Sequence, residues 1–115
     1  MPRPGRPVHG DLLQGTLDLL ILKTVANRPA HGHTIAHLIE HQSEEVLLIE
    51  HGSLYPALHR LEDRGWIASF WGTSDNNRRA RFYRLTAKGK RHLHQQQSRW
   101  IVMARAINRI VQPEN

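Results

Sequence analysis

The residues best suited to bind a charged partner are arginines gathered in one short stretch of the chain. Arg78, Arg79 and Arg81 follow Asn77 in a segment rich in turn-forming residues. A guanidinium group that neutralises a phosphate releases counterions, and an arginine near a loop tip can insert into the minor groove of DNA. This stretch therefore predicts contact with a phosphate-bearing polymer. The alternative is that its charges are only solvated.

The net charge of +6 is distributed unevenly along the 115 residues. Residues 66–112 hold ten Lys and Arg against one acid, Asp75, a net of +9, whereas residues 10–65 hold four against eight, a net of −4. Basic surface concentrated in one part of a small protein is typical of proteins with a polyanionic partner. A solvated face that keeps the protein soluble is the alternative.

A second group of polar residues surrounds an apolar stripe. Leu54, Leu58 and Leu61 recur at helical spacing. They predict a helix over about residues 52–64 that Gly65 ends. The candidate binding residues on the other faces of this helix are Ser53, Tyr55, Pro56, His59 and Arg60.

The types of these residues suit contact with DNA. Ser53 and Tyr55 carry hydroxyls near the helix N-terminus, where free N–H groups and the positive end of the dipole favour phosphate. His59 and Arg60 follow one turn later and could reach base edges or phosphates. The alternatives are partial packing of Tyr55 against the strands that follow and a solvated charge on Arg60. Pro56 fits the helix only if the helix starts near Ser53, which would place the proline in the first turn.

Histidine spacing raises the question of a metal site. His33, His37 and His41 stand at i, i+4 and i+8, which places imidazoles on one helical face. That face lies opposite the apolar residues of the same predicted helix, and the chain contains no cysteine. We therefore interpret these histidines as surface residues and expect neither a metal ion nor another cofactor.

Other function classes find little support in the sequence. It contains no Gly-x-Ser-x-Gly elbow, phosphate loop or paired-carboxylate arrangement, so we expect no enzyme activity. No apolar run approaches ~20 residues, which argues against a membrane span. The first residues also lack the apolar stretch of a signal peptide. These features lead us to expect a cytoplasmic protein.

Apolar periodicity predicts the elements that carry these residues. Asp11 is placed to cap a helix that runs to about Asn27. Residues 28–32 break the pattern, and a second helix fits residues 33–42. The apolar run at residues 46–49 fits either a short buried strand or an extended link.

The pattern changes after the third helix. Residues 66–71 and 80–85 are rich in β-formers, and residues 72–79 between them are rich in turn formers. These segments predict a β-hairpin with a polar, basic loop. Thr86 then caps a long helix that reaches about Gln112.

This order of elements predicts a mainly α (α+β) protein with a winged helix-turn-helix fold. We expect a flexible arm over residues 1–10, a winged domain over 11–86 and a dimerisation helix over 87–112. In this fold the third helix can enter a major groove of DNA while the wing reaches the neighbouring backbone. Lys88, at the start of the last helix, extends the positive surface.

The last helix has an apolar seam that one small domain cannot cover. At 1.5 Å per residue the helix is roughly 40 Å long. Its seam has the 4-3-4-3-4 spacing of a helix-pairing surface. The seam residues are Leu93, Gln97, Trp100, Ala104, Ile107 and Val111. A second copy of the chain is the simplest partner. Two recognition helices in a two-fold dimer would require a pseudo-palindromic operator, with half-sites about ten base pairs apart or a multiple of that.

Three segments resemble the PadR family of bacterial transcriptional regulators. They are residues 15–22 (GTLDLLIL), 52–62 (GSLYPALHRLE) and 83–89 (YRLTAKG). The resemblance covers roughly residues 12–111, and the single final helix is similar to the shorter branch of the family. It implies a DNA-binding regulator, typically a repressor, that dimerises through its first and last helices.

The resemblance also implies roles for individual residues. It places Leu13 and Leu17 of the first helix in the dimer interface, and Trp100 where some members pair tryptophans that sandwich planar aromatic compounds. The alternative is that Trp100 only fills the interface. Two other functions stay open: a winged-helix adaptor that binds proteins, and a metal-responsive regulator that uses the histidines.

Overall fold

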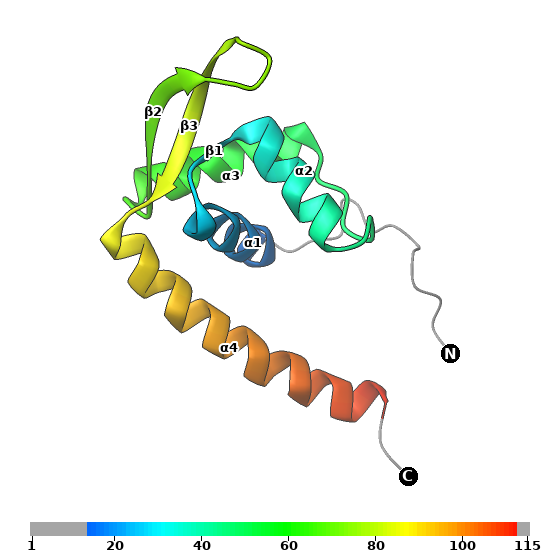
Figure 1. Ribbon diagram of the computed structural model, residues 1–115. Coiled ribbons are helices and arrows are strands. Elements are labelled where there is room, and N and C mark those ends of the chain that lie inside the picture. The colour runs from blue at the N-terminus through cyan, green and yellow to red at the C-terminus, as the bar shows by residue number, and fades with distance from the viewer. Residues whose placement is uncertain (1–13, 113–115) are drawn as a thin grey trace.

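The computed structural model describes residues 14–112, which form helices packed against a small antiparallel sheet (Figure 1). Apolar stripes and turn formers set the order of the elements, and their bounds are as follows. The elements are α1 (Gln14–Asn27), β1 (Ala30–His31), α2 (Gly32–Gln42), α3 (His51–Asp63), β2 (Ile67–Thr73), β3 (Arg79–Leu85) and α4 (Ala87–Val111). The predicted fold class, a mainly α winged helix with a long C-terminal helix, is confirmed.

The core lies where α1, α2 and α3 meet the base of the sheet. Its largest fully buried side chains are Ile21, Leu22, Ile35, Leu54, Leu58, Leu61 and Ile67. Each such side chain contributes about 1.5–3 kcal/mol on leaving water. The predicted leucine stripe of the third helix is therefore confirmed as part of the core. It fixes which face of α3 is left exposed to solvent.

The segment predicted as a breaker contains a short strand. Ala30 and His31 form β1, which pairs antiparallel with Tyr83 and Phe82 of β3. The sheet order is accordingly β1-β3-β2. A strand of two residues is too short to show alternation in the sequence. Its partner also lies some fifty residues later, so no local pattern reveals the pairing.

The apolar run at residues 46–49 is an extended link rather than a strand of the sheet. Ile49 is buried, and its N–H donates to Glu40 Oε2 at 2.8 Å. Glu44 and Glu45 precede the link with φ values of 54° and 63°. The link returns the chain from the end of α2 to the start of α3, which fixes the angle between these two helices.

The wing is the hairpin of β2 and β3, and it extends beyond the helices (Figure 1). Its register pairs Ile67 with Leu85 at the base and Thr73 with Arg79 near the tip. The turn is closed by a hydrogen bond from Ser74 N–H to Arg78 O at 2.8 Å. Asn77 adopts φ 60°, a value that asparagine tolerates better than most residues. The predicted hairpin is confirmed, with a tip that is held by its own hydrogen bonds.

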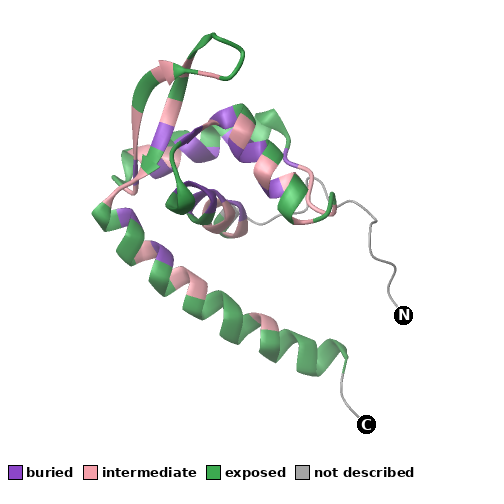
Figure 2. Ribbon diagram, viewed as in Figure 1, coloured by how far each residue is buried: buried purple, intermediate pink, exposed green. Residues whose placement is uncertain are grey.

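The last helix begins at the base of the wing. Thr86 Oγ1 accepts a hydrogen bond from Gly89 N–H at 2.9 Å, which confirms the predicted cap. Gly89 is buried, and a Cβ at this position would lie 1.9 Å from Trp66 O. The beginning of α4 is therefore pressed against the start of β2. Beyond its first turns the helix is largely exposed (Figure 2).

Several sequence-based predictions lie outside the described residues. They are the flexible arm over residues 1–10, the cap at Asp11 and the interface role of Leu13. Within residues 14–112, no helix is both long and apolar enough to cross a membrane.

Candidate nucleic-acid interface and dimer surface

The N-terminal half of α3 has an exposed polar face. Its buried residues are Leu54, Ala57, Leu58 and Leu61, whereas Ser53, Tyr55, Pro56 and His59 are exposed. Tyr55 remains 46% exposed although its ring lies over Gly32, where a Cβ would meet the ring atoms at 3.0 Å. Tyr55 therefore packs on the first residue of α2. The alternative expected from the sequence, packing of Tyr55 against the wing, is replaced by this contact between α2 and α3.

The expected position of Pro56 in the helix is wrong. The helix begins at His51, so Pro56 is its sixth residue and lies beyond the first turn. Proline has no N–H to donate to the carbonyl of Gly52 one turn earlier. Gly52 is exposed and has open space around its Cα, so water can hydrate that carbonyl. The proline is tolerated because it lies on the solvent side of the helix.

Arg60 has a role that the sequence did not suggest. Its Nη2 lies 2.7 Å from Asp18 Oδ1 of α1, and both side chains are partly buried. Arg60 is therefore neither a solvated charge nor directed to the outer face of α3. It ties α3 to α1, and its contact with DNA stays a prediction. The partner is forty-two residues away, so no local pattern reveals the pair.

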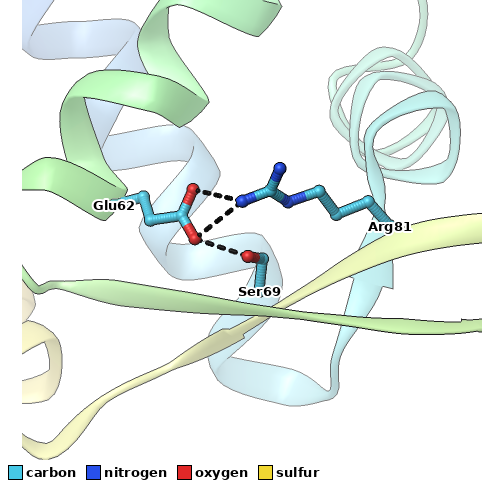
Figure 3. Close-up of polar contacts among 3 residues, drawn as sticks. All are labelled: Glu62, Ser69 and Arg81. Atoms are coloured by element: carbon cyan, nitrogen blue, oxygen red, sulfur yellow. Dashed lines mark hydrogen bonds and ion pairs between the residues drawn. The ribbon is translucent and has the colours of Figure 1, made fainter.

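Arg81 is likewise paired inside the molecule (Figure 3). Its Nη2 lies 3.0 Å from Glu62 Oε1 and 3.1 Å from Oε2, and the Ser69 hydroxyl donates to the same carboxylate. The hydrogen bond from Ser69 is the main cause that lowers the pKa of Glu62, and Arg81 adds to it. The last turn of α3 is thereby joined to both strands of the wing. The Arg81 side chain is still 47% exposed, and its contact with DNA stays a prediction.

The tip of the wing holds the cations that stay available. Asn77, Arg78 and Arg79 are exposed, and neither arginine forms an ion pair with an acid among residues 14–112. The Arg79 guanidinium lies over the ring of Trp71, 4.4 Å from its centre, and Trp71 is 60% exposed. Sequence reasoning missed Trp71. Its only signal was an aromatic residue one position before the glycine that opens the loop.

A line of rings joins the wing to α3. His31 meets Phe82 edge-on at 5.3 Å between ring centres and stacks with His33 at 6.4 Å. His33 lies 6.4 Å from His51, which lies 5.8 Å from Tyr55. The N-termini of α2 and α3 are therefore neighbours on this side, as a helix-turn-helix that contacts DNA requires.

The predicted histidine stripe is divided by this arrangement. His37 and His41 stack on each other at 6.3 Å, while His33 belongs to the line of rings above. All three are exposed, as expected. Over the part of the chain that the structure describes, no group of three or more His, Cys, Asp or Glu side chains is arranged to hold a metal ion.

Lys88 lies apart from the other predicted binding residues. It is exposed in the first turn of α4, and its side chain passes near Gly65 at the end of α3. That position is at the base of the hairpin, whereas Arg78 is at the tip. The structure therefore does not bring Lys88 together with the cations of the wing tip.

The dimer surface predicted on α4 differs in extent from the observed apolar face. Leu93 is 5% exposed and Leu17 6% exposed, because both are buried in the core of their own chain. They are thus unavailable to a partner, in contrast to their predicted role. Gln97 and Ala104 are half-buried. The exposed apolar residues of the helix are Trp100, Ile101, Val102, Met103, Ile107, Ile110 and Val111.

A groove adjoins this face. It has a volume of about 640 Å³ and lies between the start of α1 and the middle of α4. Gly15, Thr16 and Leu19 line one side, and Trp100 and Met103 line the other. Gln96, Ser98 and Arg99 add polar groups to its lining.

Comparison with known proteins agrees with this geometry. Residues 21–95 match the model of the transcriptional regulator PadR-like family. The chain is 28% identical to a transcriptional regulator from Clostridium thermocellum of known structure, with a TM-score of 0.80 over 91% of this chain and 99% of that chain. It is 27% identical to a PadR family transcription regulator from Clostridium difficile, with a TM-score of 0.71 over 83% of this chain and 97% of that one.

A relative of unknown function is similar over nearly the whole length. An uncharacterized protein from Lysinibacillus sphaericus is 26% identical over 101 residues, which cover 88% of this chain and 93% of that protein.

Proposed function

Because the chain belongs to the PadR-like family of transcriptional regulators, we propose that it binds an operator in double-stranded DNA as a homodimer and represses transcription there. The observation that carries this proposal is the division among its arginines. Among the candidate binding residues, Arg60 and Arg81 pair with acids of their own chain, whereas Arg78 and Arg79 lie exposed near the tip of the wing without such a pair. Exposed cations at the tip of a wing beside α3 are placed to reach the backbone that flanks a major groove.

In this proposal α3 is the recognition helix. Ser53, Tyr55 and His59 on its exposed face read the major groove, and the exposed cations of the wing tip contact the adjacent part of the duplex. The link between Glu62, Ser69 and Arg81 keeps the distance between helix and wing constant. An exposed ion pair contributes only about 0–1 kcal/mol to stability, so its value lies in orientation.

The exposed half of α4 supports the homodimer. Met103 and Ile110 are 48% and 80% exposed and stand seven residues apart, which places them on the same side of the helix, and this apolar side needs a cover. A second copy offers the same face, so a two-fold pairing buries both. The operator then has two related half-sites about ten base pairs apart, or a multiple of that.

A small planar molecule is the proposed signal for release. The groove beside Trp100 has a volume in the range of ligand sites. An aromatic compound stacked on Trp100 would gain about 0.5–1.5 kcal/mol beyond the burial of its area. Because the groove borders the dimer face, its occupation would change the distance between the two recognition helices.

Salt-dependent DNA binding tests the proposal. An operator duplex selected from a random pool is titrated with the wild type and with the double variant Arg78→Gln/Arg79→Gln. We expect the slope of log affinity against log salt to become shallower by about 0.9 for each lost phosphate contact. The variant Arg105→Gln/Arg109→Gln removes the same charge from exposed positions of α4 and serves as the control.

The control should keep the wild-type slope and remain dimeric in sedimentation. Equal slopes for the wing variant and the wild type would contradict the role of the wing tip, whereas failure of the wild type to select any duplex would contradict the proposal and favour a protein-binding adaptor. Repeating the titration with a varied panel of planar dyes tests the release signal, which is wrong if no dye weakens DNA binding.

A further inference from the structure

Trp71 is a large apolar side chain with no place in the core. It is 60% exposed, near the tip of a two-stranded wing. Its one described ring contact is the Arg79 guanidinium at 4.4 Å. Trp71 and Arg79 therefore form a cation–π pair, in which the guanidinium lies on the flat face of the indole ring.

The register of the wing shows which way this unit faces. Trp71 is directly opposite Arg81, and Thr73 is directly opposite Arg79, so all four residues share one face of the hairpin. Arg81 on that face reaches Glu62 of α3 (Figure 3). The stack of Trp71 and Arg79 thus lies on the side of the wing that is directed toward the recognition helix. It is closer to the tip of the wing than the contact between Arg81 and Glu62.

The opposite face of the hairpin is occupied by a different packing unit. Phe70 and Phe82 stack there at 5.6 Å between ring centres. Gly72 lies beneath them, because a Cβ at this position would lie 2.8 Å from the Phe82 ring. The wing is therefore stiffened by its other face. Trp71 is not needed to hold it together.

The position of Arg79 is restricted on three sides. The turn before it is closed by hydrogen bonds from Ser74 N–H to Arg78 O at 2.8 Å and from Asn77 N–H to Ser74 O at 2.9 Å. The strand fixes its backbone, and the indole restricts its side chain. A guanidinium that is already ordered loses little side-chain entropy on binding.

On the basis of the proposed function, we propose that Trp71 positions Arg79 for the narrow minor groove of an A·T-rich segment beside the bases read by α3. A·T-rich tracts have a narrow groove with an enhanced negative potential that attracts an inserted arginine. The indole covers one face of the guanidinium and keeps water from it. Trp71 is in this account a positioning residue, and Arg79 is the group that distinguishes the flanks.

The inference predicts a separable effect on sequence preference. Each of several proteins selects duplexes from a random pool, and affinities are then measured on duplexes that share the selected half-sites but differ in A·T-rich or G·C-rich flanks. We expect the wild type to prefer A·T-rich flanks by about tenfold, a discrimination of the size that one mismatched base pair produces. The variants Trp71→Ala and Arg79→Lys should bring the ratio to within about twofold, with the same half-sites selected.

Two further variants make the test specific. Trp71→Phe keeps an aromatic plate under the guanidinium and should retain most of the flank preference. Arg78→Gln removes a tip cation that has no such plate and should weaken binding equally on both flanks. Matching thermal unfolding of all variants shows that the wing is intact.

The outcomes separate this inference from the proposed function. If the wild type binds no duplex, the proposed function fails. If the wild type binds and Trp71→Ala keeps the tenfold flank preference, the positioning role is overturned while the DNA-binding role stands. The same holds if Arg78→Gln loses the flank preference as completely as Trp71→Ala does.

Discussion

At the residue scale, arginines of the same charge serve two purposes. Arg60 and Arg81 are held by carboxylates of their own chain, so substituting them would disturb the relative placement of the helices and the wing. Arg78 and Arg79 have no such partner among the described residues. Substituting them should affect binding while leaving the fold in place. The difference depends on which acids the fold brings near, and the residue type alone does not reveal it.

His92 adds a pH dependence to the stability of the fold. Its ring stacks on Trp66 with 3.5 Å between centres. Burial, and then the nearby Arg64, lower the pKa of His92 below its ordinary value of 6.5. The folded protein therefore binds fewer protons here than the unfolded chain does near that pH, and stability rises with pH. The contribution of His92 to stability is fully present above pH 6.5 and is lost as the pH falls through the pKa of the folded state.

We expect the free energy of unfolding, measured by urea denaturation, to be lower at pH 5.5 than at pH 7.5. In the variant His92→Phe, which keeps a ring on Trp66 and cannot titrate, this difference should shrink. The other histidines are unchanged and act as the internal reference. An equal pH dependence in both proteins would show that His92 is not responsible.

At the element scale, α4 is held to the winged domain at one end. Thr86 caps the helix, Gly89 lies against the Trp66 carbonyl, and Leu93 enters the core. Later residues of α4 extend away from this attachment (Figure 1). The first two turns set where the arm begins, and the start of α1 lies beside its middle, across the groove lined by Trp100 and Met103.

Gly89→Ala tests this attachment. The added methyl would lie 1.9 Å from backbone, which cannot move aside as a flexible side chain can. We expect a loss of about 1–3 kcal/mol or more in the free energy of unfolding, as for other overpacked sites. Gly52→Ala, where nothing lies within 4 Å, should leave stability unchanged or slightly raised. Chemical denaturation measures both, and equal stabilities would contradict a tight contact.

The elements were largely predictable from the sequence because their signals are local. The stripe of Leu54, Leu58 and Leu61 marked α3, and Thr86 marked the start of α4. The features that escaped prediction depend on distant partners. They are β1, which exists through its pairing with β3, and the ion pairs whose members lie forty-two and nineteen residues apart.

The candidate site shows the same division. Exposed positions on α3 followed from helical phase, whereas the ion pairs of Arg60 and Arg81 required the fold. Leu93 also matched the periodicity of an interface, and the family resemblance implied the same role for Leu17. Periodicity cannot tell whether an apolar position faces its own core or a partner, and both lie in their own core.

At the scale of the whole molecule, the shape itself indicates a partner. The described residues extend over 54 Å in one direction and 29 and 22 Å in the others, because α4 projects from the domain. Its outer half exposes large apolar side chains that include Ile107, at 50%. In the proposed dimer these faces cover each other, and the two recognition helices are held at a fixed distance.

The measurement that tests the central claim most directly is a hydroxyl-radical footprint on a duplex selected by the wild type. We predict two protected segments related by two-fold symmetry, with centres about ten base pairs apart or a multiple of that. Ile107→Glu, which places a charge in the proposed interface, should sediment as a monomer and lose the paired footprint at the same protein concentration. A single unsymmetrical footprint for the wild type, or an unchanged footprint for a monomeric variant, would contradict a DNA-binding homodimer.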